Sequence, residues 1–176
     1  MGLLRLQLSR KGVMCMWNYT ETDAYDSISL HDCRTEDIRM DGDDLVINFP
    51  DGFWITPVSK HINHDSPLKT GPSQLRMYGF AVGGVIDAVD LFKTTYLFRK
   101  PILCRRIRMV PEDFLKLVND GKHELEFLWE FHRPGNGLYQ CWLYRKNHGI
   151  GVECQFEITA KYIEYRWNEI LPDREW

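Results

Sequence analysis

Apolar and polar residues alternate one by one along the C-terminal half of the chain, and this period of two constrains the fold more than any other feature. In the run HELEFLWEFH, residues 123–132, one face of an extended strand carries Leu125, Phe127, Trp129 and Phe131. The same alternation follows over 138–146, 152–158 and 163–167. Because successive side chains of a strand point to opposite faces, the pattern predicts an antiparallel meander of four strands with one core face.

Turn and helix signals complete the outline. Pro134-Gly135-Asn136-Gly137 supplies a hairpin turn after the first of these strands. A helix is indicated near 111–120, where a proline precedes two acids and a glycine follows. Further strands are expected over 26–33, 37–40, 44–49, 53–58, 75–82, 85–91, 95–99 and 102–110. We therefore predict a mainly β fold (α+β at most), either an antiparallel β-sandwich or a strongly curled sheet with one short helix.

Length and composition set the organisation. A chain of 176 residues with 27% charged residues is typical of one globular domain. We expect residues 1–16 to form a flexible tail and residues 17–176 a single β-rich domain. The N-terminal run lacks the continuous apolar region of a signal peptide, and nowhere do about eighteen apolar residues follow one another. The five scattered cysteines lack C-x-x-C spacing, and three of them fall inside predicted strands, where free cysteine behaves as a small hydrophobic residue. This favours a reducing compartment, so the expected location is cytoplasmic, with no membrane partner.

Acidic residues dominate the predicted meander and suggest its partner. Glutamates would project from its solvent face at Glu124, Glu126, Glu130, Glu153, Glu157 and Glu164. Such a face is complementary to a basic protein, for which charge speeds encounter and sets specificity. The leading hypothesis is therefore a non-enzymatic binding protein, of the kind that inhibits a basic toxin. It would use this acidic face and its hairpin tips.

The segment from Arg99 to Arg108 is basic, in contrast to the acidic meander, and contains five bases and no acid. As a strand it would place Arg106 and Arg108 on one face, where cross-strand pairing with glutamates is expected. Since the net charge of the whole chain is −3, nucleic acid is not expected as a partner.

Aromatic residues support an alternative function. Trp129 and Trp167 follow the core phase of their strands, whereas Trp54 comes just after Asp51-Gly52-Phe53 and is the tryptophan expected to be exposed at a binding site. Alternatively, aromatic side chains line a cavity, and the protein is a carrier of a small apolar or sugar ligand.

Reactive clusters are few. In SLHDC, residues 29–33, alternation would put His31 and Cys33 on one face and Asp32 on the other. A Cys–His nucleophile pair is then geometrically possible, but its orienting third group would have to come from elsewhere in the chain. His61, His64 and Asp65 are candidate metal ligands, although their spacing matches no strict signature. They make a metal-dependent hydrolase the third hypothesis. Because the first two hypotheses need no cofactor, none is predicted.

Two short runs resemble hairpin pieces of uncharacterised bacterial β-rich domains. They are DLVINFPDGFW, residues 44–54, and YRWNE, residues 165–169. The resemblance implies a β fold and carries no functional residue with it.

Overall fold

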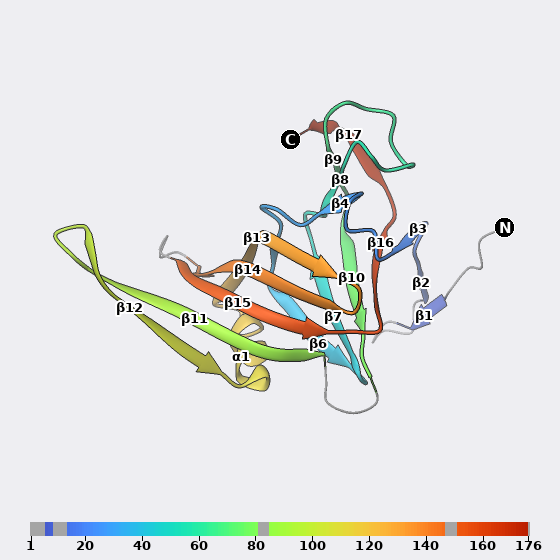
Figure 1. Ribbon diagram of the computed structural model, residues 1–176. Helices are drawn as coiled ribbons and strands as arrows, with labels where there is room; N and C mark the ends of the chain where they lie inside the picture. Colours follow the sequence, from blue (N-terminus) through green and yellow to red (C-terminus); the bar gives the residue numbers. More distant parts are fainter. Residues whose placement is uncertain (1–5, 9–13, 81–84, 147–150, 176) are drawn as a thin grey trace.

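Two antiparallel sheets pack face to face in the computed structural model, which describes residues 6–8, 14–80, 85–146 and 151–175 (Figure 1). The five-stranded sheet has the order β3 (Tyr19–Thr22), β16 (Tyr162–Trp167), β10 (Ser73–Tyr78), β7 (Asp44–Phe49) and β6 (Asp37–Asp41). The six-stranded sheet has the order β12 (Lys100–Met109), β11 (Ile86–Leu97), β15 (Gly151–Thr159), β14 (Asn136–Arg145), β13 (His123–Arg133) and β5 (Arg34–Thr35). The predicted mainly β, antiparallel fold with one short helix is confirmed, and of the two predicted architectures the structure is consistent with the sandwich.

Smaller elements lie at the edges of the sandwich. Four short strands form a further sheet in the order β17 (Ile170–Glu175), β9 (Leu68–Thr70), β8 (Trp54–Ile55) and β4 (Ile28–Ser29). Within the segment expected to be a tail, β1 (Leu6–Leu8) pairs with β2 (Met14–Met16). The remainder of that segment, 1–5 and 9–13, lies outside the described residues.

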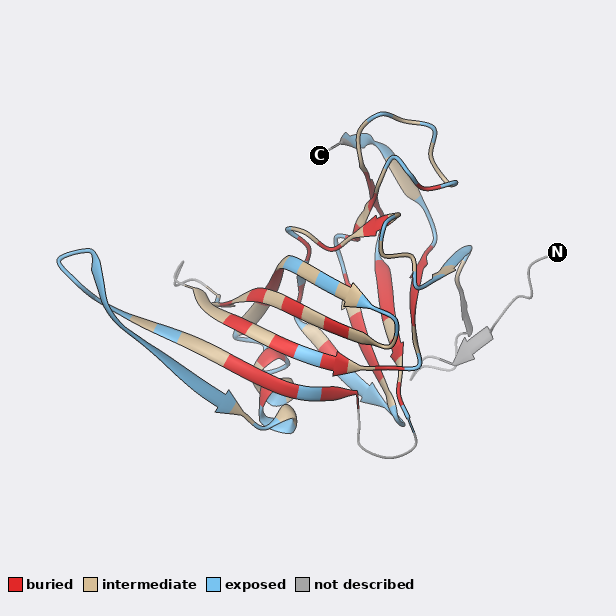
Figure 2. Cartoon of the chain, in the orientation of Figure 1, coloured by how far each residue is buried: buried red, intermediate tan, exposed pale blue. Residues whose placement is uncertain are grey.

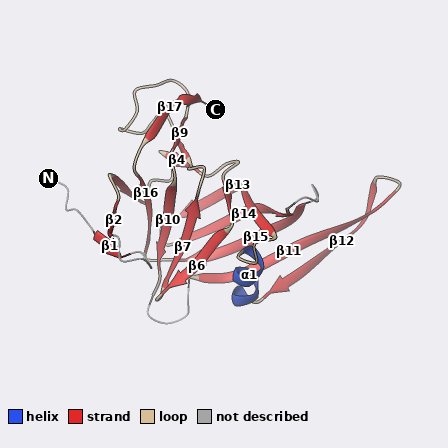
Figure 3. Cartoon of the chain, turned by 180° about the vertical axis from the view of Figure 1, so that it is seen from behind, coloured by secondary structure: helices blue, strands red, loops and turns tan. Residues whose placement is uncertain are grey.

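The core fills the space between the two large sheets. The Phe127 ring of β13 lies edge-on to Phe49 of β7, with centroids 5.4 Å apart, and to Phe156 of β15 at 6.0 Å. Buried residues follow the inner faces of both sheets (Figure 2). The predicted helix is present as α1 (Pro111–Val118), and it buries Phe114 and Val118. It packs against the six-stranded sheet (Figure 3), where its Phe114 ring meets Phe156 at 5.7 Å. Among the described residues, no helix has the length and apolar character needed to cross a membrane.

A β-bulge in β13 corrects the expected burial of its aromatic residues. Phe127 pairs with Cys141, but the next paired residue is Trp129, so Leu128 is an extra residue in the strand. An extra residue reverses the side-chain phase beyond it. Trp129 and Phe131 therefore point outward, each 58% exposed, although the alternation had predicted both in the core.

The four-strand meander is also wrong in its last strand. Strands β13, β14 and β15 pair in sequence as predicted, but β16 crosses to the other sheet and pairs with β10 and β3. The crossing occurs at Ala160 and Lys161, where Lys161 N–H donates to the Tyr78 carbonyl oxygen at 2.7 Å. Glu164 thus belongs to a different surface from the glutamates of β13 and β15.

Two expectations for the N-terminal half are wrong for local reasons. Residues 44–54, which resemble a hairpin piece, do turn at Pro50-Asp51-Gly52, but this turn links β7 of one sheet to β8 of another and does not close a hairpin. Residues 26–33 form a strand only over Ile28–Ser29, because the chain then turns through Asp32, whose φ is +55°. That turn buries Cys33 beside Leu30 in the core.

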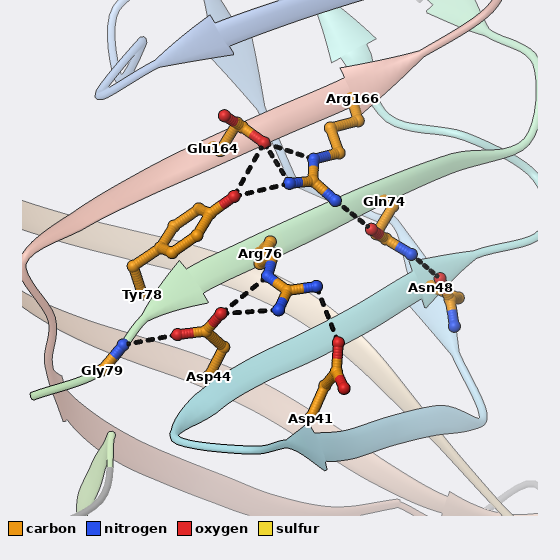
Figure 4. Close-up of polar contacts among 9 residues, drawn as sticks. All are labelled: Asp41, Asp44, Asn48, Gln74, Arg76, Tyr78, Gly79, Glu164 and Arg166. Carbon is orange, nitrogen blue, oxygen red and sulfur yellow. Dashed lines mark hydrogen bonds and ion pairs between the residues drawn. The ribbon is translucent and has the colours of Figure 1, made fainter. Parts of the chain in front are cut away.

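The outer face of the five-stranded sheet carries a polar network (Figure 4). Arg166 lies at its centre; it contacts Glu164 and donates to Gln74 at 3.0 Å and to the Tyr78 hydroxyl at 2.7 Å. Gln74 in turn donates to Asn48 at 2.9 Å. A second cluster lies beside it, in which the guanidinium of Arg76 bridges Asp44 and Asp41. The network joins β7, β10 and β16 from the side opposite the core.

Candidate functional site: the β11–β12 arm

The hairpin of β11 and β12 extends away from the sandwich (Figure 1). At its root, β11 pairs on its other side with β15 as far as Phe92, opposite Glu153. Beyond that point the described pairing is between β11 and β12 alone, and we call residues 93–105 the arm. From Lys93 to Arg108 every residue except Thr94 is exposed, so the hairpin is pale blue over most of its length in Figure 2.

Ion pairs hold the root of the arm. Asp90 of β11 accepts from Arg106 Nη2 at 2.6 Å and contacts Arg108 Nε at 2.9 Å, both on β12. The hydrogen bond from Arg106 is the main reason that the pKa of Asp90 is lowered. The expected cross-strand pairing of these arginines is therefore present, with an aspartate in place of glutamates. Arg106 and Arg108 thus anchor the arm to the sheet.

The tip of the arm is a two-residue turn of unusual composition. Leu97 pairs with Lys100, and the residues between them, Phe98 and Arg99, have φ of +48° and +64°. Turns with both central residues at positive φ favour Asn-Gly, because larger side chains clash with the backbone there. Each such residue costs about 1 to 3 kcal/mol. The chain accepts this strain and places at the tip an aromatic ring that is 89% exposed.

Large apolar side chains surround that turn. They are Tyr96, Leu97, Phe98, Ile102 and Leu103, all more than half exposed. Burial of one such side chain contributes about 1.5 to 3 kcal/mol. A cluster of exposed large apolar side chains on one projecting element is typical of an interaction site.

Like charges accompany the apolar tip. Lys93 and Arg105 are direct cross-strand partners, an arrangement that repels. The segment 91–110 contains six bases and no acid, which leaves sixteen bases against twenty-five acids in the rest of the chain, a formal charge of −9. Positive charge is thus concentrated on one projecting element. An anionic group from a binding partner would relieve the Lys93–Arg105 repulsion.

The arm also has little to stabilise it by itself. A two-stranded hairpin without a covered face is at best marginally stable in water. Among the described strands, β12 is an edge of its sheet, so its outward backbone N–H and C=O groups are open to pairing. Apolar surface, excess positive charge and an open edge therefore coincide.

The glutamates proposed from sequence as an acidic binding face have partners within the fold. Arg34 of β5 bridges Glu124 and Glu126 at 3.0 and 3.1 Å. Beyond the bulge, Glu130 turns inward, accepts from Leu30 N–H at 2.7 Å and contacts His132 at 3.2 Å.

The remaining two glutamates lie on β15. Glu153 accepts from Gln140 at 2.8 Å, whereas Glu157 is exposed. The structure brings these five glutamates to one sheet and leaves only part of their charge uncompensated.

Trp54 does not have the exposure expected of it. Its indole N–H donates to the His31 carbonyl oxygen at 2.9 Å, and the Lys69 ammonium lies 4.3 Å from the ring centroid. The side chain is half-buried, whereas Trp129 is the more exposed. The structure thus reverses the order that the sequence predicted for these two tryptophans.

His61, His64 and Asp65 do not converge. His61 Nε2 contacts Glu21 at 2.6 Å, and its ring lies edge-on to Trp167 at 5.2 Å. His64 Nδ1 accepts from Ser66 N–H at 3.2 Å. Within the described ranges, three or more His, Cys, Asp or Glu side chains do not gather as a metal-binding group.

The SLHDC segment is a turn beside the core. The imidazole of His31 contacts the Leu128 carbonyl oxygen, and Asp32 lies 3.6 Å from its other nitrogen. Cys33 is buried, with the Lys69 ammonium 3.3 Å from its sulfur. Burial raises the pKa of the Cys33 thiol to about 11 in spite of that ammonium.

Thiol reactivity should follow this burial. Among the described cysteines, Cys104 on the arm is exposed, whereas Cys33, Cys141 and Cys154 are buried. In a Cys15→Ser variant, we expect an aromatic disulfide reagent at pH 8 to titrate one thiol rapidly, because a buried protonated thiol is a poor nucleophile. The other three should react only as denaturant unfolds the chain. A second thiol reacting as fast as Cys104 would contradict the burial of the three.

Sequence reasoning identified the strands of the arm but not the arm. The available signal was the run of bases from 99 to 108 next to Tyr96-Leu97-Phe98 and Ile102-Leu103. Apolar residues in such a run are normally taken as core, because sequence does not show whether a second layer covers them.

Comparisons of the chain with protein-family models, with curated proteins and with solved structures found no match.

Proposed function

We propose that this protein is a binding protein that captures an acidic protein partner with the β11–β12 arm. The observation that carries the proposal is the exposed tip, where Phe98 and its apolar neighbours share a hairpin with Lys93 and Arg105, for which the described part of the chain provides no ion-pair partner. The partner would add an extended segment along the open edge of β12, as in other strand-addition complexes. Acidic side chains of that segment would neutralise Lys93 and Arg105.

Other classes of partner fit these observations less well. Nucleic-acid interfaces are polar and strongly basic, whereas five large apolar side chains crowd this tip and the rest of the chain carries −9. Insertion into a membrane would carry Arg99 and Lys100 inward together with Phe98, because all three occupy the same turn.

Pairing of β12 with β12 of a second copy is also disfavoured. An antiparallel pair centred near Cys104 and Arg105 would bring arginines of the two copies together. An acidic segment of a different protein satisfies both the charge and the open edge.

The proposal is tested by binding of three defined probes. These are an extended peptide of alternating valine and glutamate, anionic phospholipid vesicles, and a DNA duplex. The decisive variant replaces Phe98 by Asn and Arg99 by Gly, which removes the most exposed ring and one base from the tip but supplies the residues that this turn prefers. We expect it to leave stability unchanged or raised and to weaken peptide binding at least tenfold, which corresponds to about 1.4 kcal/mol.

A charge-reversal variant completes the test. Lys93→Glu with Arg105→Glu keeps a like-charged cross-strand pair and reverses its sign. The repulsion within the variant arm is therefore similar to that in the wild type. Peptide binding should be lost, whereas the controls Val58→Ser and Lys122→Glu, at exposed sites outside the arm, should bind as the wild type does. Binding of vesicles or duplex without the peptide, or of no probe at all, would overturn the proposal.

A further inference from the structure

The outer face of the six-stranded sheet carries an aromatic surface that is separate from the arm. The bulge at Leu128 turns Trp129 and Phe131 to this face, one after the other along β13. Neither ring is needed in the core, and each is more than half exposed. Exposed aromatic rings in a row on a sheet form a platform against which flat apolar faces of a ligand can stack.

Polar side chains lie beside these rings in register. Trp129 pairs with Gln140, which pairs with Gln155 on β15. Phe131 pairs with Leu138, which pairs with Glu157. Since neighbouring strands are about 4.8 Å apart, the β15 side chains lie roughly 10 Å from the rings. A row of rings thus runs parallel to a row of hydrogen-bonding groups.

A cavity of about 300 Å³ lies beside Phe131, at the end of this platform where β13 turns into β14. It is lined in part by Phe131, Leu138, Glu157, Asp87, Arg133 and Asn136. Its volume is at the small end of the range for ligand sites. The cavity spans four strands of one sheet, so the sheet itself holds its walls in place.

Hydrogen bonds position two of the polar side chains of this cavity, Asp87 and Asn136. Asp87 on β11 accepts from the Thr159 hydroxyl at 2.7 Å, and the same hydroxyl contacts Asn136 Oδ1 at 3.3 Å. Asp87 and Glu157 are acceptors, whereas the guanidinium of Arg133 and the amide of Asn136 can donate. A ligand whose groups both donate and accept can satisfy all of them. Sugar hydroxyls have this property.

We propose that this cavity and the adjoining platform bind a carbohydrate, with one sugar ring stacked on Phe131 and a following ring on Trp129. The mixture of groups selects this class. The carboxylates of Asp87 and Glu157 disfavour a small anion, and the guanidinium of Arg133 offsets part of the attraction for a small cation. The hydroxyls of a neutral pyranose can bond with both kinds of group while its C–H face covers the ring.

The test uses defined neutral oligosaccharides, from mono- to tetrasaccharides of glucose, galactose, mannose and N-acetylglucosamine, in an array and then by calorimetry. We expect at least one to bind saturably and to change tryptophan fluorescence through Trp129. Phe131→Ala should weaken that binding at least tenfold, and Glu157→Gln several-fold, at unchanged melting temperature.

Phe98→Ala is the matched control, since it removes an exposed ring from the arm. It should leave sugar binding intact, and Phe131→Ala should leave peptide binding by the arm intact, so the two proposals can fail separately. No binding in the panel, binding of the polyamine spermidine in its place, or sugar binding that persists unchanged in Phe131→Ala would overturn the carbohydrate site.

Discussion

Replacing Arg166 by methionine is expected to lower the free energy of unfolding by about 3 to 5 kcal/mol, because a buried charge would be left without its partner. The side chains of Arg166 and Glu164 are 6% and 8% exposed, and they contact each other on the outer face of the five-stranded sheet (Figure 4). Without the guanidinium, the carboxylate of Glu164 would still accept a hydrogen bond from the Tyr78 hydroxyl at 3.3 Å. It would have no positively charged partner among its described contacts. Chemical denaturation followed by fluorescence measures the loss.

Two further variants show whether the cause is the orphaned charge. Replacing both Arg166 and Glu164 by methionine should recover a large part of the loss, since no buried charge then remains. Arg39→Met is the matched control on the same sheet, because its ion pair with Asp37 is half-exposed and should contribute less than about 1 kcal/mol. Equal losses in Arg39→Met and Arg166→Met would contradict a buried network.

Trp167→Ala should be comparably damaging, with a loss of about 3 to 5 kcal/mol. Trp167 is fully buried, and its ring is stacked on Tyr19 at 5.4 Å and lies edge-on to Phe53 at 5.8 Å. Truncation leaves a cavity that these rings cannot close. The melting temperature and the denaturation midpoint both report the loss.

Trp129→Ala is the control, and it tests the bulge directly. Because Trp129 is 58% exposed, its removal should change stability by less than about 1 kcal/mol. Both tryptophans occupy the core phase in the sequence pattern, so only the extra residue Leu128 distinguishes them. A loss in Trp129→Ala as large as in Trp167→Ala would mean that β13 runs without the bulge.

The sequence predicted the parts of this fold in which one local pattern decides. Strands β13, β14 and β15, the turn at Pro134–Gly137 and helix α1 all follow from alternation, turn residues and helix-end signals. The bulge was not predicted, because nothing at Leu128 interrupts the alternation of apolar and polar residues in a recognisable way. The apolar positions 125, 127, 129 and 131 continue at a spacing of two on both sides of it. The crossing of β16 was missed for a similar reason, since alternation resumes after Lys161 whichever sheet the strand enters.

The candidate site was even harder to predict from the sequence than the fold. The bases of the arm were visible, but the cross-strand repulsion of Lys93 and Arg105 depends on a turn at Phe98 and Arg99, where no glycine or asparagine marks it. The exposure of Ile102 and Leu103 depends on the packing of the whole molecule, because no second layer among the described residues covers the faces of the arm. Both facts are tertiary, and no local window of sequence contains them.

Photo-crosslinking in the source cell tests the central claim most directly. A benzophenone amino acid is placed at Phe98 on the arm, and in a second variant at Val58, which is 72% exposed and lies outside the arm. The account predicts one dominant adduct from position 98 that is absent from position 58 and lost with Lys93→Glu and Arg105→Glu. The captured protein should be acidic, and when purified it should bind the wild-type protein but not the charge-reversal variant. The same adducts from both positions, or an adduct that survives charge reversal, would contradict the assignment of the arm as the binding surface.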